Sequence, residues 1–278
     1  MNAQLCPTAG LEKLLLSTDG SEFSEGAIRE AINLAKTCSS RLFAVSVVEV
    51  NPEFEALAPQ LVEKVEKETR QHLESVKSRA AGEGVECEII AHQGEEPYKY
   101  IVEEAAKNRV DMIIMGRRGR SGLKRLMLGS VAAKVIGHAP CNVLIAPRAA
   151  RVVCKNILIA TDGSRYSDAA SMQSIGIAKR LGSSLFAVSV AHSDAELQET
   201  RDNVNRVKEL AGREGIKVET LTPTGRPYEA IVDAARQMNA DLIVVGSHGR
   251  TGIERLLMGS VTERVIGHAD CAVLVVKA

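Results

Sequence analysis

The chain has 278 residues, which leaves room for two domains of about 140 residues, each large enough to bury its own core. Its composition is that of an ordinary globular protein, with 45% hydrophobic and 25% charged residues. The 35 basic and 35 acidic side chains give a net charge of zero, which argues against a nucleic-acid binder with a basic face.

Short apolar runs alternate with helical stretches along the chain. In the first half they predict strands near 13–18, 41–48, 85–91, 111–115 and 141–146, and helices near 23–37, 59–81, 96–108 and 130–138. The strands are apolar almost throughout, as in a parallel sheet with helices on both faces. The pattern therefore predicts a doubly wound α/β domain, with ligands at the carboxyl ends of the strands.

The second half repeats this pattern. Thr18-Asp19-Gly20-Ser21 recurs as Thr161-Asp162-Gly163-Ser164, and more than half of the positions in 116–145 are identical in 246–275. The period is far too long for a solenoid, so these are two whole domains. We expect them to span residues 1–150 and 151–278.

A glycine-rich loop follows the fourth predicted strand of each copy. Its pattern is Gly-x2-Gly-x9-Gly-Ser, ending in Ser130 in the first copy and Ser260 in the second. Glycines let a backbone approach a ligand closely, and consecutive N–H groups before a helix attract anions. The two serines suit either a phosphate contact or a helix N-cap. Two copies of the pattern favour phosphate binding over a structural turn.

Motifs for fast phosphoryl transfer are missing from the sequence. There is no Gly-Lys-[Ser/Thr] of a Walker A loop, no Gly-x-Gly-x-x-Gly and no His-x-Gly-His. Neither a lysine for the terminal phosphates nor an acidic metal ligand is evident. Binding is thus favoured over catalysis. A slow ATPase or phosphotransferase, and an interaction module that binds no nucleotide, remain as alternatives.

An aspartate at the end of the first strand of each copy is a second candidate. The Asp19 and Asp162 carboxylates could accept a hydrogen bond from an exocyclic amine or a ribose hydroxyl. An Asp turn before the following helix is the alternative. The repetition beside the glycine loop favours the ligand contact.

Together, the Thr-Asp turn after strand one and Gly-x2-Gly-x9-Gly-Ser after strand four resemble the universal stress proteins, in their tandem, ATP-binding type. The resemblance covers nearly the whole chain. It implies two Rossmann-like (adenine nucleotide α-hydrolase-like) domains, each a five-stranded parallel sheet in the order 3-2-1-4-5. It also implies binding of ATP, or AMP or ADP, with or without Mg²⁺, by a nucleotide-responsive stress regulator whose protein partner is unknown.

The resemblance also implies the binding residues. Asp19 and Val47 would hold adenine in the first domain, as Asp162 and Val190 would in the second. The other implied contacts are Thr18, Met115, Gly116, Gly119, Arg120, Gly129 and Ser130, and their counterparts Thr161, Val245, Gly246, Gly249, Arg250, Gly259 and Ser260.

The two loops differ in charge. The first carries Arg117 and Arg118 where the second has Ser247 and His248, so we expect the first site to be more electropositive. Arg118 could contact a phosphate or point to solvent. His248 has no evident carboxylate partner, and no metal site is expected.

The last strand of each domain, 142–146 and 272–276, is apolar and lies at a sheet edge in this strand order, which is a liability unless the edge is paired. In the family this strand pairs domains, so we expect the two halves to pair within the chain. Whether two chains associate into a homodimer is left open.

Three further expectations concern the cysteines, the helix near 59–81 and the location. The six cysteines show no Cys-x-x-Cys spacing and are expected to be free thiols in a reducing cytoplasm. In the helix near 59–81, the apolar residues at helical spacing are expected to be core; they are Leu61, Val62, Val65, Leu73 and Val76. No apolar stretch is long enough to span a bilayer and residues 1–10 lack a secretion signal, so the chain is expected to be cytoplasmic.

Overall fold

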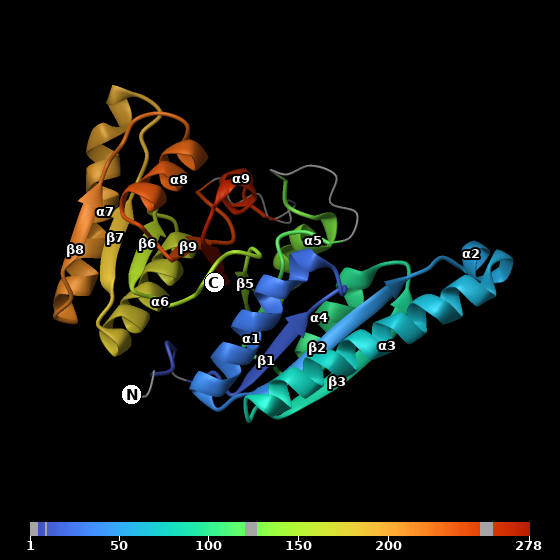
Figure 1. The fold of residues 1–278 in the computed structure, drawn as a ribbon. Coiled ribbons are helices and arrows are strands. Elements are labelled where there is room, and N and C mark those ends of the chain that lie inside the picture. The colour runs from blue at the N-terminus through green and yellow to red at the C-terminus, as the bar shows by residue number, and fades with distance from the viewer. Residues whose placement is uncertain (1–4, 9, 120–126, 251–257) are drawn as a thin grey trace.

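The computed structural model describes residues 5–8, 10–119, 127–250 and 258–278 (Figure 1). In the first half, short apolar strands alternate with amphipathic helices: β1 (Lys13–Ser17), α1 (Glu25–Cys38), β2 (Arg41–Glu49), α2 (Pro52–Leu57), α3 (Pro59–Gly82), β3 (Cys87–Gly94), α4 (Pro97–Asn108), β4 (Met112–Met115), α5 (Ser130–His138) and β5 (Asn142–Ile145). The second half follows the same plan: β6 (Asn156–Ala160), α6 (Arg165–Leu181), β7 (Ser184–Val188), α7 (Leu197–Arg213), β8 (Val218–Leu221), α8 (Pro227–Gln237), β9 (Leu242–Gly246), α9 (Ser260–His268) and β10 (Ala272–Val276).

All ten of these strands form one continuous sheet in the order β3-β2-β1-β4-β5-β10-β9-β6-β7-β8. Each half is parallel and has the expected order 3-2-1-4-5, so the predicted fold class is confirmed. The halves join where β5 and β10 pair antiparallel, with Leu144 opposite Leu274. The two exposed apolar edges therefore cover each other, and the expected pairing of the domains within the chain is confirmed.

Helices cover both faces of this sheet and bury two hydrophobic cores. On one face, α1, α3, α6 and α7 contribute side chains such as Ile28, Leu73 and Ile175 to the first core. On the other face, α4, α5, α8 and α9 contribute side chains such as Ile101, Ile136 and Ile266 to the second. Because two layers of helix enclose each half-sheet, only the strand ends are left open to a ligand. No helix in the described residues is long and apolar enough to cross a membrane.

Most of the apolar residues at helical spacing in the long helix α3 lie in the core, as expected. Val62, Leu73 and Val76 are buried, and Val65 packs against a small cluster that contains Val62. Leu61 is the exception: it lies in the first turn of the helix and is 55% exposed, although the next residue, Val62, is buried. Figure 1 shows this end of α3 beside α2, at the far end of the first domain. The short helix α2, which the sequence did not predict, precedes this turn.

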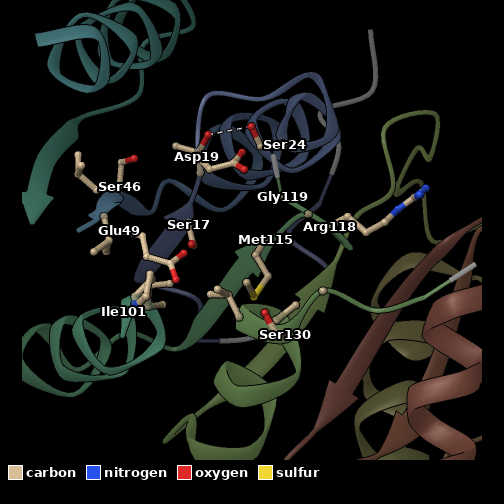
Figure 2. A pocket seen from close by; sticks show the side chains of 18 of the residues that line it. Ser17, Asp19, Ser24, Ser46, Glu49, Ile101, Met115, Arg118, Gly119 and Ser130 are labelled. Carbon is tan, nitrogen blue, oxygen red and sulfur yellow. Dashed lines mark hydrogen bonds between the residues drawn. The ribbon is translucent and has the colours of Figure 1, made fainter. Parts of the chain in front are cut away.

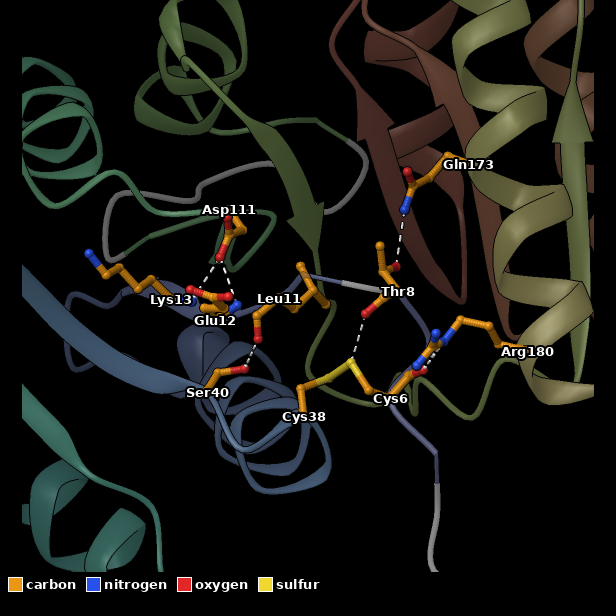
Figure 3. Close-up of a disulfide and its surroundings, with 10 residues drawn as sticks. All are labelled: Cys6, Thr8, Leu11, Glu12, Lys13, Cys38, Ser40, Asp111, Gln173 and Arg180. Atoms are coloured by element: carbon orange, nitrogen blue, oxygen red, sulfur yellow. Dashed lines mark hydrogen bonds between the residues drawn. A yellow bond between two sulfur atoms is a disulfide. The ribbon is translucent and has the colours of Figure 1, made fainter.

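The expectation of six free thiols is wrong for two of them. Cys6 forms a disulfide with Cys38, the last residue of α1 (Figure 3). The N-terminal segment lies between the domains: Arg180 of α6 donates to the Cys6 carbonyl at 3.0 Å, and Gln173 donates to the Thr8 hydroxyl at 3.0 Å. This course brings together two cysteines that are 32 positions apart, a proximity that their spacing does not reveal. The four other cysteines, Cys87, Cys141, Cys154 and Cys271, are free.

Candidate functional site

In both domains a cavity lies where the carboxyl ends of the central strands meet the start of the helix that follows the glycine loop. The first, of about 310 Å³, lies between β1, β2 and β4 and the start of α5. The second, of about 580 Å³, occupies the equivalent place between β6, β7, β9 and α9. Both volumes fall in the range of small-molecule sites.

Every described residue that the sequence placed in a site lines one of these cavities. Arg120 lies outside the described residues. The first cavity contains Thr18, Asp19, Val47, Met115, Gly116, Gly119, Gly129 and Ser130. The second contains Thr161, Asp162, Val190, Val245, Gly246, Gly249, Arg250, Gly259 and Ser260.

The aspartates both build the turn and face the cavity. Asp19 Oδ1 accepts hydrogen bonds from the Ser21 backbone N–H at 3.0 Å and the Ser21 hydroxyl at 2.7 Å. Asp162 Oδ1 accepts from the Ser164 N–H at 3.0 Å. The Asp turn foreseen as an alternative is therefore present. It orients the carboxylate against the glycine loop, where a Cβ on Gly119 would lie 2.7 Å from Asp19 Oδ2.

The first glycine of each loop is required by the fold itself. A Cβ on Gly116 would lie 2.8 Å from the Phe23 carbonyl oxygen, and one on Gly246 would lie 2.7 Å from the Tyr166 carbonyl carbon. Real Cβ atoms do not approach backbone so closely, so only glycine lets the ends of β4 and β9 pass beside the segments that follow β1 and β6.

The last glycine of each loop has no such requirement. Gly129 and Gly259 have φ of −66° and −64°, which any residue adopts. The nearest atoms to an added Cβ are 3.4 Å and 3.5 Å away, an ordinary contact distance. The fold would accept alanine at both positions.

The serines that follow do not cap their helices. Gly129 and Gly259 are the N-cap residues, and Ser130 and Ser260 are the first residues of α5 and α9. The N-cap role considered for the serines is therefore wrong, because each helix begins one residue earlier than that role needs. Within the described residues neither hydroxyl makes a hydrogen bond. Ser130 lines the first cavity (Figure 2), and Ser260 lines the second.

The two described arginines of the first loop point to different places. Arg118 lines the cavity, but its guanidinium extends outward and lies 5.2 Å from the centre of the Phe23 ring (Figure 2). Arg117 does not line the cavity. It reaches the second domain, and burial lowers the pKa of its guanidinium. Of the extra loop arginines in the described residues, only Arg118 adds positive charge to the first cavity.

Arg250 crosses the second cavity. Its backbone N–H donates to Asp162 Oδ2 at 2.9 Å, and its guanidinium donates to Asn203 at 3.2 Å and forms an ion pair with Glu199 of α7. The side chain thus ties the glycine loop to α7 and to the Asp turn.

Several lining residues were missed by the sequence reasoning. Thr69 of α3 and Thr200 of α7 are both buried and line the two cavities. Counting back from Gly84 and Gly215, which end the two helices, aligns these threonines. Pro97 and Pro227 also line the cavities, and the recurring Pro-Tyr at these positions was a usable signal.

The described residues contain no group of three or more His, Cys, Asp or Glu side chains that could hold a metal ion. His248, the one loop histidine, lies beside the Ser247 hydroxyl at 3.1 Å and next to the Tyr166 ring.

A family profile and the similar curated proteins all point to one family. The profile of the Universal stress protein family matches residues 10–147 and 154–277. A universal stress protein of Methanocaldococcus jannaschii is 40% identical over 139 residues, which cover 44% of this chain and 82% of the relative. A Staphylococcus aureus protein described as a universal stress protein is 38% identical over 142 residues, 45% of this chain and 86% of that one.

Solved structures extend the likeness to the whole chain. A universal stress protein from Archaeoglobus fulgidus superposes with a TM-score of 0.75 at 25% identity, over 96% of this chain and 99% of that one. A structure from Pseudomonas aeruginosa has a TM-score of 0.68 at 18% identity, over 96% of this chain and 94% of that one, and shares the fold.

Proposed function

This chain belongs to the universal stress protein family, as a tandem of two domains, and from that premise we propose that it binds an adenine nucleotide in both cavities. The ligand would be ATP, or AMP or ADP, with or without Mg²⁺. Nucleotide binding would make the protein a nucleotide-responsive stress regulator, and it would act in the cytoplasm. The first domain would span residues 1–150 and the second 151–278.

The observation that carries this proposal is the pair of free serine hydroxyls. Ser130 and Ser260 each stand at the first position of a nine-residue helix, line a cavity and make no hydrogen bond within the described residues. A hydroxyl, the first N–H groups of the helix and its positive dipole end together suit a phosphate. Gly129 and Gly259 support this assignment, because the fold alone would accept alanine there.

The rest of each cavity suits the nucleoside. Val47 and Ile101 in the first domain, and Val190 and Ile231 in the second, offer apolar contacts for a flat base. Asp19 and Asp162 lie at the turn between these apolar residues and the glycine loop, where a carboxylate would accept from an amine or a ribose hydroxyl.

The test uses Ser130→Ala and Ser260→Ala with Mg-ATP in calorimetric titrations. Each variant should lose affinity at one of two sites by about tenfold, the equivalent of one lost hydrogen bond to a charged group. Its free energy of unfolding should stay within about 0.5 kcal/mol of the native value, since the hydroxyl makes no hydrogen bond to any residue that the structure describes.

The matched control is Ser40→Ala. The Ser40 hydroxyl is buried, lies outside both cavities and donates to the Leu11 carbonyl, so this variant should lose stability by about 1 kcal/mol and keep its affinity for Mg-ATP. If millimolar Mg-ATP, ADP and AMP all fail to bind the native protein, the proposal is wrong. The alternative of an interaction module that binds no nucleotide is then favoured.

A further inference from the structure

The Arg117 side chain connects the first glycine loop to a helix of the second domain. Its Nη1 donates to the carbonyls of Gly267 and Ala269, both at 2.9 Å, and to that of Ile266 at 3.3 Å. Ile266 and Gly267 belong to the last turn of α9, and Ala269 follows that helix. These carbonyls have no partner within their own helix, so the cation caps the negative end of the α9 dipole.

The opposite end of α9 forms the wall of the second cavity. Gly259 and Ser260, which begin the helix, line that cavity. A single nine-residue helix therefore touches the glycine loop of the first site with its last turn and builds the anion cradle of the second site with its first.

A second cation makes the reciprocal connection. Lys277 Nζ donates to the carbonyls of Ile136 at 2.9 Å and Gly137 at 3.2 Å, in the last turn of α5. The preceding residue, Val276, accepts a hydrogen bond from the Ser247 N–H at 3.1 Å, at the start of the second glycine loop. The first turn of α5 carries Ser130 of the first cavity.

The two connections do not arise from the internal repeat alone. Ser247 stands where the first domain has Arg117, and Pro147 stands where the second domain has Lys277. Each domain thus gives one cation to the opposite helix, but from a different position of the repeat.

We propose that the two nucleotide cavities are coupled through α9, with Arg117 as the positioning residue, so that occupancy of the first tightens binding in the second. The proposal rests on the proposed function. The Arg117 carbonyl accepts from the Gly129 N–H at 2.9 Å, so a phosphate held at Gly129 and Ser130 also fixes the Arg117 backbone. Since its guanidinium lies outside the first cavity, the phosphate holds Arg117 on α9 and does not draw it away.

Two tryptophan reporters give a separate signal for each cavity, because the chain has no tryptophan of its own. Phe23→Trp places an indole beside Arg118 of the first cavity, and Tyr166→Trp places one beside His248 of the second. Val47→Tyr fills the first cavity, and loss of the Phe23→Trp response to Mg-ATP verifies the block.

The measured quantity is the Kd of Mg-ATP at the Tyr166→Trp reporter, with the first cavity open and with it blocked. With Arg117 present, the block should weaken second-site binding about fivefold or more, a usual size for coupling between sites. In R117S, which introduces the residue found at the equivalent position of the second loop, the same block should change that Kd less than twofold. Arg117→Lys keeps a cation and should restore part of the coupling.

Each failure has a distinct signature. If neither reporter responds to Mg-ATP, the proposed function is wrong. If both respond but the block has the same effect with and without R117S, or strengthens second-site binding, the coupling through Arg117 is wrong. Circular dichroism on every variant verifies that it folds, and Arg117→Lys replaces R117S as the test should the latter unfold.

Discussion

Arg117 and Lys277 each donate to the last carbonyls of a helix in the opposite domain, Arg117 to α9 and Lys277 to α5. Both helices begin at a candidate phosphate site and end at the boundary between the domains. The pairing of β5 with β10 brings these two ends close to the central strands. The strand pair that joins the two halves of the sheet therefore also brings the two candidate sites into connection.

Lys277→Ala should destabilise the protein by about 1–2 kcal/mol. The variant removes a half-buried cation from the end of α5 and leaves two carbonyls without their donor. Urea unfolding measures the loss. Lys155→Ala, which truncates an exposed lysine, is the control and should change stability by less than about 0.5 kcal/mol. Equal effects of the two variants would contradict a capping role for Lys277.

The disulfide between Cys6 and Cys38 should stabilise the fold by about 3–4 kcal/mol, because it closes a loop of 32 residues in the unfolded chain. Protein purified without reductant should unfold at a higher urea concentration than protein treated with a dithiol, which reduces the bond to two thiols and is itself oxidised to a disulfide. Cys6→Ser should match the reduced protein and show no further response to dithiol. An intact mass corresponding to six free thiols in untreated protein would contradict the bond.

The sequence was informative where structure is local and repeated. Asp19 and Asp162 sit in identical Asp-Gly-Ser turns, and Gly116 and Gly246 end equivalent strands, so both the turns and the loop could be placed from the pattern. The pairing of β5 with β10 was implied by the resemblance to the family, and it agrees with the need of an apolar edge strand for a partner.

Side-chain direction and long-range chain course were not accessible in this way. Counting arginines in the first loop suggested that the first cavity is more electropositive than the second, but Arg117 turns into the other domain, where free helix carbonyls attract it. The Cys6–Cys38 bond depends on the path of residues 5–8 beside α1 and α6. Ser130 and Ser260 are not N-cap residues, because each helix starts one residue earlier than that role needs. Sequence patterns do not locate a helix start to within one residue.

The buried thiols should make the protein less stable at alkaline pH. Burial raises the pKa of Cys87 to about 11 and that of Cys154 to about 12, against about 8.5 in an unfolded chain. Below pH of about 8.5 these thiols are protonated in both states and their contribution is complete. Between about pH 9 and 12 only the unfolded state releases the protons, so stability falls as the pH rises.

Thermal unfolding between pH 7 and 10.5 checks this dependence. The double variant Cys87→Ala with Cys154→Ala should show a shallower fall in Tm than the native protein over this range, whatever its Tm at pH 7. Cys6→Ser is the control, because its partner thiol is not among the buried ones, and its slope should exceed that of the double variant. Parallel slopes for all three proteins would rule out the two thiols as the cause.

Glu199 should restrain binding in the second cavity. It lines the cavity and holds the Arg250 guanidinium in an ion pair, so a phosphate must compete with this carboxylate for the cation. Glu199→Gln removes the negative charge and leaves the Arg250 guanidinium hydrogen-bonded to the neutral Asn203 side chain and Asp162 carbonyl. Mg-ATP should then bind the second site about three- to tenfold more tightly, on the order of 1 kcal/mol. The Tyr166→Trp reporter measures that affinity in a Val47→Tyr background, in which the first cavity is blocked.

Glu68→Gln is the matched control, because Glu68 has the equivalent position on α3 when the two helices are aligned from Gly84 and Gly215. Glu68 lies outside the first cavity and pairs with Lys64 across one helical turn. Its replacement should leave both affinities unchanged. Weaker binding in Glu199→Gln would mean that Glu199 holds Arg250 in the geometry that receives the phosphate, and the ion pair would then be part of the binding site and not a restraint on it.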